Sequence, residues 1–387
     1  MDTLVTIEKL VHGGMGLART DKGVLFVEDV LPGERVGVKI MGARGGQPWA
    51  KPLAIENPSP HRRRPPCAFF GQCGGCDWLH GSYDIQVSSK KEIFVDCLNR
   101  VGKIRDVPEM EVYPSPEFGY RQRVQYNIDY TRKVLGFYRR RSSEIVPITE
   151  CPLLRPQLNT VLKELRGITI VMPESVDQIK CIAGMRFVTA SSPVFTPITS
   201  AMTTVQTAKY TFAVSGNCFF QGNAYLCEKL GMWAKESVQG SHFVDLYGGV
   251  GFFSVFLHER FKTGILVDNV KEHVDLAQQN FSDNGISNCH ATNATAEDFL
   301  YGMAAKKNPL DCLVVDPPRA GLFPEVRQAL CKHPPQSILY VSCNPATQAR
   351  DVALLLKTEK YAIKKIALFD LYPNTHHMET AIVLTKV

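Results

Sequence analysis

Three residues in the carboxyl-terminal part of the sequence carry side chains that suit covalent catalysis. Cys343 stands in Val-Ser-Cys-Asn-Pro, Asp316 opens Asp-Pro-Pro-Arg, and Glu379 follows His-His-Met. A cysteine thiolate is a strong nucleophile, and a neighbouring carboxylate can remove a proton from the molecule that the thiolate attacks. These residue types therefore predict a reaction through a covalent intermediate with proton abstraction.

Each of these residues adjoins an apolar run that is typical of a buried strand. Asp316 and Cys343 follow such runs, whereas Glu379 opens one. In an open α/β sheet, the loops at the carboxyl ends of parallel strands share one crevice. A final strand that runs antiparallel would bring its amino end to the same rim. We therefore expect these three side chains around one cavity.

Cys343 has surroundings that favour a nucleophile over a core residue. A single cysteine beside a strand is usually a small buried residue, but the polar neighbours and the strand-breaking Pro345 favour an exposed loop here. A reactive thiol needs a depressed pKa, which a nearby cation or backbone N–H groups can provide. Arg319 and Arg350 are both candidates for that cation, and the sequence does not choose between them.

A glycine turn after a predicted strand indicates a nucleotide-type cofactor. Gly249 and Gly251 allow the backbone to approach a ligand closely, and Asp268, at the end of the next predicted strand, can accept hydrogen bonds from ribose hydroxyls. Such a turn serves dinucleotides as well as adenosyl cofactors. Ser254 stands where the dinucleotide fingerprint has its third glycine, so we favour an adenosyl cofactor.

Four further cysteines have a spacing that suits a metal centre. Cys67, Cys73 and Cys76 enclose a pair of glycines, and Cys151 is followed by proline far downstream. Four thiolates fit either a zinc ion or an iron–sulfur cluster, and spacing alone does not decide between them. The sequence has 12 cysteines but no recognisable export signal, so metal ligands, free thiols or a nucleophile are expected rather than disulfides.

A basic stretch at 119–141 is the candidate contact for nucleic acid. Its candidate residues are Arg121, Arg123, Arg132, Lys133 and Arg139, with aromatic residues between them. Positive charge beside aromatic rings suits phosphate contact and base stacking, and the formal net charge of +6 permits such a partner. The alternative is a solvated strand face over an aromatic core. We favour the core for the tyrosines that alternate with Val124, and nucleic acid for the arginines.

The elements that must position these residues fall into three predicted domains. Residues 1–58 hold short strand-like runs between turns, which predicts a small β-barrel of the oligonucleotide-binding type, although a barrel without a ligand fits the pattern nearly as well. Residues 59–210 hold the four spaced cysteines, a predicted helix at 83–100, a hairpin within 120–150, and then a helix followed by strands. Residues 211–387 alternate between strands and helices.

That alternation predicts an α/β domain in which helices cover both faces of a parallel sheet. The strand-like runs lie at 243–247, 265–268, 289–292, 312–316, 338–342, 362–369 and 379–385, with a helix at 270–280 among the intervening segments. The chain has 387 residues, 44% of them hydrophobic, and no apolar segment long enough to span a membrane. We expect a cytoplasmic monomer that contacts no membrane.

Together these features resemble the RNA 5-methyluridine methyltransferases, in particular the iron–sulfur, TRAM-domain branch that modifies 23S ribosomal RNA. The resemblance covers nearly the whole chain, and its order and spacing of motifs are highly specific. Its carriers are Gly13 to Gly16, the four spaced cysteines, Phe219 to Asn223, Asp245 to Gly251, Asp316 to Arg319, Ser342 to Pro345, and His377 to Glu379. It implies a TRAM barrel at 1–58, an iron–sulfur domain at 59–210 and a class I, Rossmann-like methyltransferase sheet at 211–387. The segment 80–103 is then expected to pack on the catalytic sheet.

The resemblance also implies residue roles. S-adenosylmethionine is the expected methyl donor, and a [4Fe-4S] cluster rather than zinc is expected at Cys67, Cys73, Cys76 and Cys151. Cys343 is the expected nucleophile and Glu379 the expected base. The residues expected near the cofactor or substrate are Gln221, Tyr247, Gly249, Gly251, Asp268, Asn293 and Asp316. The target uridine must be flipped out of any helix to reach them.

Three other functions compete with this interpretation. The nearest is the same reaction on a transfer RNA uridine. RNA cytosine 5-methylation is disfavoured, because that group typically has a second cysteine near its Asp-Pro-Pro or Pro-Cys motif, whereas Arg319 follows the two prolines here. A non-catalytic RNA-binding or redox protein is disfavoured because Cys343 and Glu379 occur together.

Overall fold

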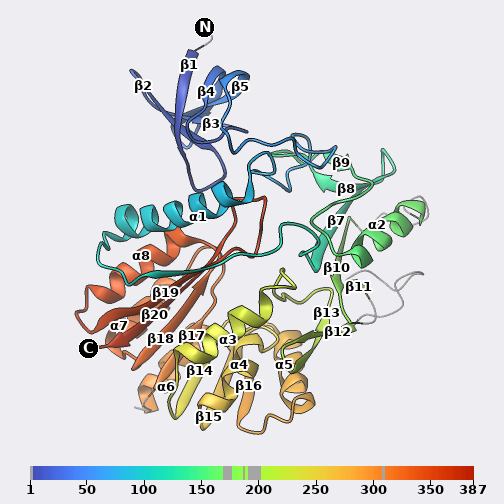
Figure 1. The fold of residues 1–387 in the computed structure, drawn as a ribbon. Helices are drawn as coiled ribbons and strands as arrows, with labels where there is room; N and C mark the ends of the chain where they lie inside the picture. The colour runs from blue at the N-terminus through green and yellow to red at the C-terminus, as the bar shows by residue number, and fades with distance from the viewer. Residues whose placement is uncertain (1–2, 169–176, 186–187, 191–201, 307–309) are drawn as a thin grey trace.

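A closed β-barrel forms the amino-terminal part of the chain, at the top of Figure 1. The computed structural model describes residues 3–168, 177–185, 188–190, 202–306 and 310–387. The barrel strands are β1 (Thr3–Leu10), β2 (Gly16–Thr20), β3 (Gly23–Val27), β4 (Arg35–Arg44) and β5 (Gln47–Asn57), closed in the order β1-β2-β3-β5-β4. Alternate residues such as Val36 and Val38 fill its interior. The predicted barrel is confirmed.

A smaller antiparallel sheet follows the cysteine-rich loop. Its order is β11 (Val188–Ala190), β10 (Gln178–Ala183), β7 (Arg123–Asp129), β8 (Val134–Tyr138), β9 (Ile145–Pro147), and helix α2 (Pro156–Ile168) lies beside it. The predicted hairpin is β7–β8, and Tyr126 is fully buried against α2, which confirms the aromatic core. The helix and strands predicted within 155–210 are present in the described part of that range; 169–176, 186–187 and 191–201 lie outside it.

The carboxyl-terminal part is built on one eight-stranded sheet. Its order is β16 (Cys289–Asn293), β15 (Thr263–Asp268), β14 (His242–Leu246), β17 (Cys312–Val315), β18 (Ser337–Ser342), β20 (Glu379–Lys386), β19 (Tyr361–Phe369), β6 (Met110–Tyr113). Strands β14 to β18 are parallel, whereas β20 is antiparallel to both of its neighbours. All seven predicted strands and the reversed direction of the last one are therefore confirmed. Strand β6 was not predicted; it joins the edge of the sheet from a part of the chain that lies far before the other strands in sequence.

Helices cover both faces of this sheet (Figure 1). One face carries α3 (Cys227–Ser237), α4 (Phe252–Leu257), the turn His258–Arg260 and α5 (Lys271–Asp283), and the hairpin of β12 (Met202–Thr207) and β13 (Tyr210–Ser215) packs with them. The other face carries α6 (Ala296–Lys306), α7 (Pro324–Lys332) and α8 (Pro345–Leu356). Alternate residues of β17 point to the two cores: Leu313 and Val315 to one, Cys312 and Val314 to the other.

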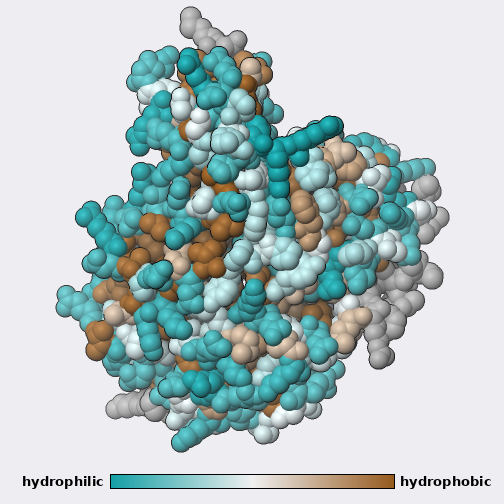
Figure 2. Space-filling view, viewed as in Figure 1, coloured by the Kyte–Doolittle hydropathy of each residue, from teal (hydrophilic) through white to brown (hydrophobic). Residues whose placement is uncertain are grey.

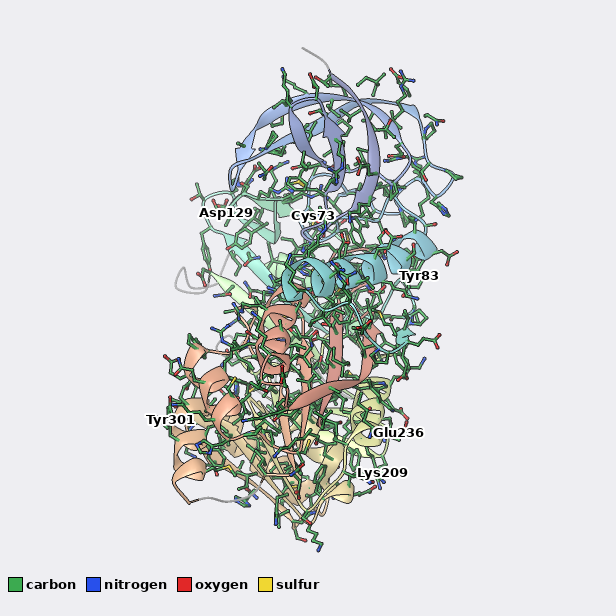
Figure 3. All side chains as sticks on the ribbon, turned by 90° about the vertical axis from the view of Figure 1, so that its left-hand side faces the viewer. Cys73, Tyr83, Asp129, Lys209, Glu236 and Tyr301 are labelled. Atoms are coloured by element: carbon green, nitrogen blue, oxygen red, sulfur yellow. The ribbon has the colours of Figure 1, made fainter. Side chains whose placement is uncertain are left out.

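Helix α1 (Tyr83–Cys97), continued by the π-turn Leu98–Gly102, packs on the same face as α8 although it precedes β14 by more than a hundred residues. Ile93 and Phe94 enter that core, and an ion pair between Lys9 and Asp96 links the helix to the barrel. Hydrophobic side chains gather on the visible surface over α1 and α8 (Figure 2). In the side view, Cys73 lies below the barrel and above Tyr83, the first residue of α1 (Figure 3). The division into three sequence domains stays a prediction.

None of the helices in the described residues is both long enough and apolar enough to cross a bilayer. The long helix α1 is interrupted by charged and polar residues, with Gln86 and Lys90 among those it buries. Their burial has a consequence for the candidate site, because both contact the segment that leads into β20.

Candidate active site at the rim of the sheet

The antiparallel pairing of β18 and β20 brings the candidate nucleophile and base together. Ser342, the last residue of β18, pairs with Thr380 of β20. Cys343 follows Ser342 and Glu379 precedes Thr380, so the antiparallel pairing sets these two residues opposite one another at the rim. The Thr380 hydroxyl donates a 3.0 Å hydrogen bond to the Ser342 carbonyl and fixes this register. Asp316 follows β17, the parallel neighbour of β18. The structure therefore places all three side chains at one edge.

These three groups are buried together, and their pKa values reflect this. Burial, and then the negative charge of Asp316, raises the pKa of Glu379 well above its usual range. Oxygen Oε1 of Glu379 has no hydrogen-bond partner. Burial, followed by the charges of Glu379 and Asp316, raises the pKa of Cys343 to about 12. The predicted depression of the thiol pKa is therefore wrong for the protein without ligands, because burial beside two acids outweighs the cation.

Arg319 is the cation that faces these groups. Its positive charge and a hydrogen bond lower the pKa of Cys343, and its charge also lowers that of Glu379. Arg350, the other candidate, instead bonds Asp351 and the carbonyl of Ala320. The side chains of Asn344 and Thr347 hold the Arg319 loop by donating to the Arg319 carbonyl at 2.9 and 3.2 Å.

Asp268 and Tyr247, the residue before the glycine turn, line a cavity of 290 Å³. Its lining includes Tyr247, Asp268, Asn269, Thr295, Glu297 and Phe323. The Gly249 amide donates a 3.0 Å hydrogen bond to Asp268, and Tyr247, Gly249 and Gly251 have positive φ angles of 60°, 54° and 90°. The buried Tyr247 hydroxyl has no partner. A pocket of this size with unsatisfied polar groups fits the adenosine part of the predicted cofactor.

Two other predicted cofactor residues flank this region. Gln221 is buried, and a Cβ on its neighbour Gly222 would come within 3.1 Å of the Tyr372 ring. Burial, and then the negative charge of Glu379, raises the pKa of Tyr372, so this ring lies near the catalytic groups. Asn293 pairs with Asp268 in the sheet and donates a 3.0 Å hydrogen bond to its carbonyl oxygen. Direct contact of either residue with the cofactor stays a prediction.

Asp245 lies near Asp316 and was not among the predicted site residues. Its Oδ2 accepts hydrogen bonds from the amide and hydroxyl of Ser254 at 3.1 and 2.7 Å, whereas its buried Oδ1 has no partner. Burial raises the pKa of Asp245 to about 7. Burial and then Asp245 raise the pKa of Asp316 to about 7 as well. The sequence held a signal for it, since Asp245 is the last polar residue of the strand that precedes the glycine turn.

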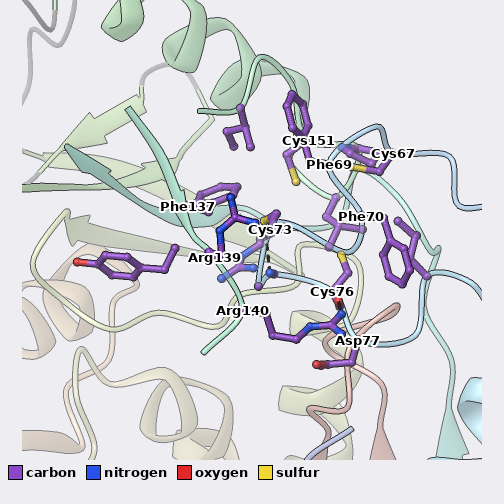
Figure 4. A pocket seen from close by; sticks show the side chains of 18 of the residues that line it. Cys67, Phe69, Phe70, Cys73, Cys76, Asp77, Phe137, Arg139, Arg140 and Cys151 are labelled. Atoms are coloured by element: carbon purple, nitrogen blue, oxygen red, sulfur yellow. Dashed lines mark hydrogen bonds between the residues drawn. The ribbon is translucent and has the colours of Figure 1, made fainter. Parts of the chain in front are cut away.

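The four predicted metal ligands line one cavity of 480 Å³ (Figure 4). Three come from the loop 67–76 (the cysteine loop) and Cys151 comes from the segment before α2. Within the described part of the chain, no three His, Cys, Asp or Glu side chains converge closely enough to bind a single ion. Four thiols that line one cavity are a donor set that an iron–sulfur cluster can take, and the [4Fe-4S] cluster stays a prediction.

The glycines of the cysteine loop serve close packing. The Gly74 amide donates a 2.9 Å hydrogen bond to the Tyr138 carbonyl, and a Cβ at Gly74 would lie 3.0 Å from the backbone of Arg140. Arg140 in turn donates to the Cys76 carbonyl at 2.7 Å and pairs with Asp29 of the barrel. The loop is therefore fixed between the hairpin and the barrel.

The five candidate RNA-binding residues differ in environment. Arg132 pairs with Asp129 and Arg139 with Glu144, each at 2.7 Å, and Lys133 is exposed at the hairpin turn. Arg132 and Lys133 lie in the turn between β7 and β8, whereas Arg139 follows β8 and lines the cavity of the four cysteines. At Arg132 and Arg139 a phosphate would compete with a carboxylate.

Arg121 and Arg123 lie nearer the catalytic rim. Arg121 lines the cysteine cavity and donates to the Arg123 carbonyl at 3.1 Å. The Arg123 guanidinium lies 5.7 Å from the centre of the Phe219 ring, which is 49% exposed. An exposed aromatic ring beside a cation offers a surface on which a base can stack.

Comparison with known proteins matches this architecture. Residues 197–387 match the family model described as tRNA (Uracil-5-)-methyltransferase, and residues 3–46 match the TRAM domain. An uncharacterized RNA methyltransferase of Aquifex aeolicus is 32% identical over 98% of this chain and 97% of its own length. A 23S rRNA (uracil(1939)-C(5))-methyltransferase of Vibrio campbellii is 28% identical over 99% of this chain and 95% of its own.

A solved structure shares the fold over almost the whole chain. The Pyrococcus abyssi tRNA (uracil-54, C5)-methyltransferase, solved with S-adenosyl-L-homocysteine, superposes with a TM-score of 0.76 at 23% identity, covering 99% of this chain and all of that one. At this identity the likeness concerns the fold.

Proposed function

This chain belongs to the RNA uracil-C5 methyltransferases, and on that premise we propose that its substrate is a uridine of 23S ribosomal RNA. The activity itself is S-adenosylmethionine-dependent methylation of uracil carbon 5 in RNA. The observation that carries the residue assignments is the pairing that sets Cys343 opposite Glu379. The choice of ribosomal RNA is supported by the full-length likeness to the Vibrio enzyme and by the cysteine set.

Cys343 supplies the nucleophile in the proposed reaction. Carbon 5 of uracil is a poor nucleophile, so the Cys343 thiolate first forms a bond to carbon 6, and the electron pair of the 5,6 double bond becomes available at carbon 5. When bound, S-adenosylmethionine would supply the methyl group that carbon 5 takes up, and cleavage of its S–CH3 bond would leave S-adenosylhomocysteine. Arg319 stabilises the thiolate form, because its charge faces the Cys343 sulfur.

Glu379 completes the reaction by taking the proton from carbon 5. The electron pair of that C–H bond re-forms the double bond, and the bond from Cys343 to carbon 6 breaks. The raised pKa of Glu379 makes its ionised form a stronger base than an exposed carboxylate. Asp316, on the neighbouring strand end, orients the uracil edge or the cofactor.

RNA reaches this rim as an unpaired, flipped nucleotide. The TRAM barrel and the hairpin hold the flanking RNA, with Arg121, Arg123, Arg132, Lys133 and Arg139 as phosphate contacts. Single-stranded loops suit such an enzyme because their bases are already splayed.

Binding of S-adenosylmethionine is expected to strengthen as pH rises through 7. Asp245 and Asp316 have pKa values raised to about 7, so both are largely neutral at pH 6 and ionised at pH 8. An ionised carboxylate attracts the sulfonium cation, whereas a neutral one does not, so the affinity should increase about tenfold across this range. Calorimetry of the protein without RNA measures it. Asp316→Asn should flatten the dependence, and an unchanged slope in that variant would exclude Asp316.

We also propose that Cys67, Cys73, Cys76 and Cys151 hold a [4Fe-4S] cluster, because their four thiols line one cavity. Protein purified without oxygen should be brown and contain about four iron and four sulfide per chain. Cys73→Ser should lower both together, whereas Cys331→Ser, on helix α7, should lower neither. Stoichiometric zinc without iron would contradict the assignment.

Mass spectrometry of RNA from a deletion strain tests the choice of substrate. We expect one 5-methyluridine to disappear from 23S ribosomal RNA, with transfer RNA unchanged, and to return with the wild-type gene but not with Cys343→Ala. Loss from transfer RNA alone would overturn the ribosomal assignment while keeping the reaction.

A further inference from the structure

The segment 370–378, which connects β19 to β20 and ends next to Glu379, is held by parts of the chain outside the catalytic sheet. Asn374 is its centre: it is fully buried and has a φ of 67°. Its side-chain oxygen accepts hydrogen bonds from Arg63 and Gln86 at 2.9 and 3.1 Å, and its amide nitrogen donates to the Glu117 carbonyl at 2.9 Å. Surroundings this complete impose a backbone conformation that a free loop would not keep.

Helix α1 holds the first half of this segment. The ammonium group of Lys90 contacts Asp370 at 2.5 Å and the Tyr372 carbonyl at 3.0 Å, and both charged side chains are fully buried. The hydroxyl of Tyr120 donates to the Pro373 carbonyl at 3.0 Å. Loss of one partner of a buried ion pair leaves an uncompensated charge, so these contacts strongly favour one position of the segment.

The cysteine loop holds the second half, through the residue that follows Cys76. The backbone amides of Asp77 and Trp78 both donate to the Asn374 carbonyl, at 3.1 and 3.0 Å. The Asp77 carboxylate accepts a hydrogen bond from the His376 amide at 3.2 Å and lies 2.7 Å from Nδ1 of its ring. The candidate metal ligand Cys76 is therefore the direct neighbour in sequence of Asp77, which contacts the segment leading to Glu379.

The contact continues toward the catalytic groups and toward the barrel. The rings of His376 and His377 lie 4.1 Å apart, and His377 is two residues before Glu379. The ring of His12, from the β1–β2 turn, meets His376 edge-on at 6.0 Å. The indole of Trp78 donates to the Gly14 carbonyl in the same turn at 3.0 Å. The barrel, the cysteine loop and the segment 370–378 thus meet around Asp77.

We propose that Asp77 is a positioning residue for the last chemical step. By holding His376 it fixes segment 374–378 and so the place of Glu379 relative to Cys343. The cysteine loop then affects catalysis without contacting the substrate, because a well-ordered loop holds Asp77, and Asp77 holds the segment that positions Glu379. The inference rests on the proposed role of Glu379, and the experiment separates the two.

The first measurement is amide hydrogen exchange of the protein without RNA or cofactor. Asp77→Ala should raise exchange about tenfold at 377–378, beyond the residue that Asp77 touches directly, because a charge-assisted contact is lost. Asp77→Asn keeps an acceptor oxygen and should restore most of the protection. Asp275→Ala, which removes an exposed ion pair with Lys271 on α5, is the control and should change nothing there. Unchanged exchange in Asp77→Ala would overturn the proposal.

The second measurement is the lifetime of the covalent intermediate in a single turnover. Asp77→Ala should slow release of methylated RNA about tenfold more than it slows methyl transfer. His376→Ala removes the same contact without changing the cysteine loop and should act alike, and the double variant should be no worse than the worse single one. Additive losses, or equal slowing of both steps, would overturn the proposal. If Glu379→Gln accumulates no intermediate, the base assignment fails instead, whatever the exchange result.

Discussion

Replacing Glu379 by glutamine is expected to leave the protein joined covalently to its methylated RNA. Glutamine keeps the size of the side chain but cannot accept the carbon 5 proton. Cys343, Arg319 and the cofactor pocket are unchanged, so addition and methyl transfer still proceed, whereas elimination does not. The product should be a protein–RNA band that resists denaturation and carries label from the methyl group of the cofactor. Turnover should fall by about three orders of magnitude or more.

Asp316→Asn is the matched comparison, because it changes the other buried acid of the same cluster. If Asp316 binds or orients rather than removing the proton, this variant should form the adduct more slowly and still release it. Normal turnover without any trapped adduct in Glu379→Gln would show that a different group removes the proton.

Cys343→Ala is expected to abolish methyl transfer, by about four orders of magnitude or more, because no other thiol faces carbon 6 in the proposed reaction. The variant should still bind S-adenosylmethionine, since the 290 Å³ cavity is lined by residues of other strand ends. Methyl transfer is measured with labelled cofactor, and binding by calorimetry.

Cys331→Ala is the control for this variant, since Cys331 is a half-buried cysteine on helix α7, outside the cluster of acids. It should keep wild-type activity. Near wild-type transfer by Cys343→Ala would contradict the assignment of the nucleophile. The raised pKa of Cys343 adds a condition: in the protein without ligands the thiol is protonated at neutral pH, so alkylation of Cys343 should be slow there and accelerate as pH rises.

The strands of the catalytic sheet could be predicted from sequence because their signal is local. A strand buried on both faces must be apolar along its length, so runs such as 312–315 and 338–341 can be recognised as strands in the sequence. The polar residues that end these runs then share a rim by topology alone. Strand β6 was missed by the sequence prediction because it is short and half-exposed, and its place at the sheet edge depends on pairing with β19. Pairing between segments 250 residues apart leaves no periodicity to detect.

Sequence by itself determined which chemical groups this protein has and in what order the strands present them. Tertiary structure decided how those groups behave. The thiol pKa of Cys343 depends on how deeply it is buried and on which charges lie nearby, and those charges come from the ends of two other strands, β17 and β20. The same holds for the choice of Arg319 over Arg350, and for Asp77, which is next to a cysteine in sequence but lies against His376 only in the folded chain. Burial and charge proximity are sums over the whole fold, so they exist only once it has formed.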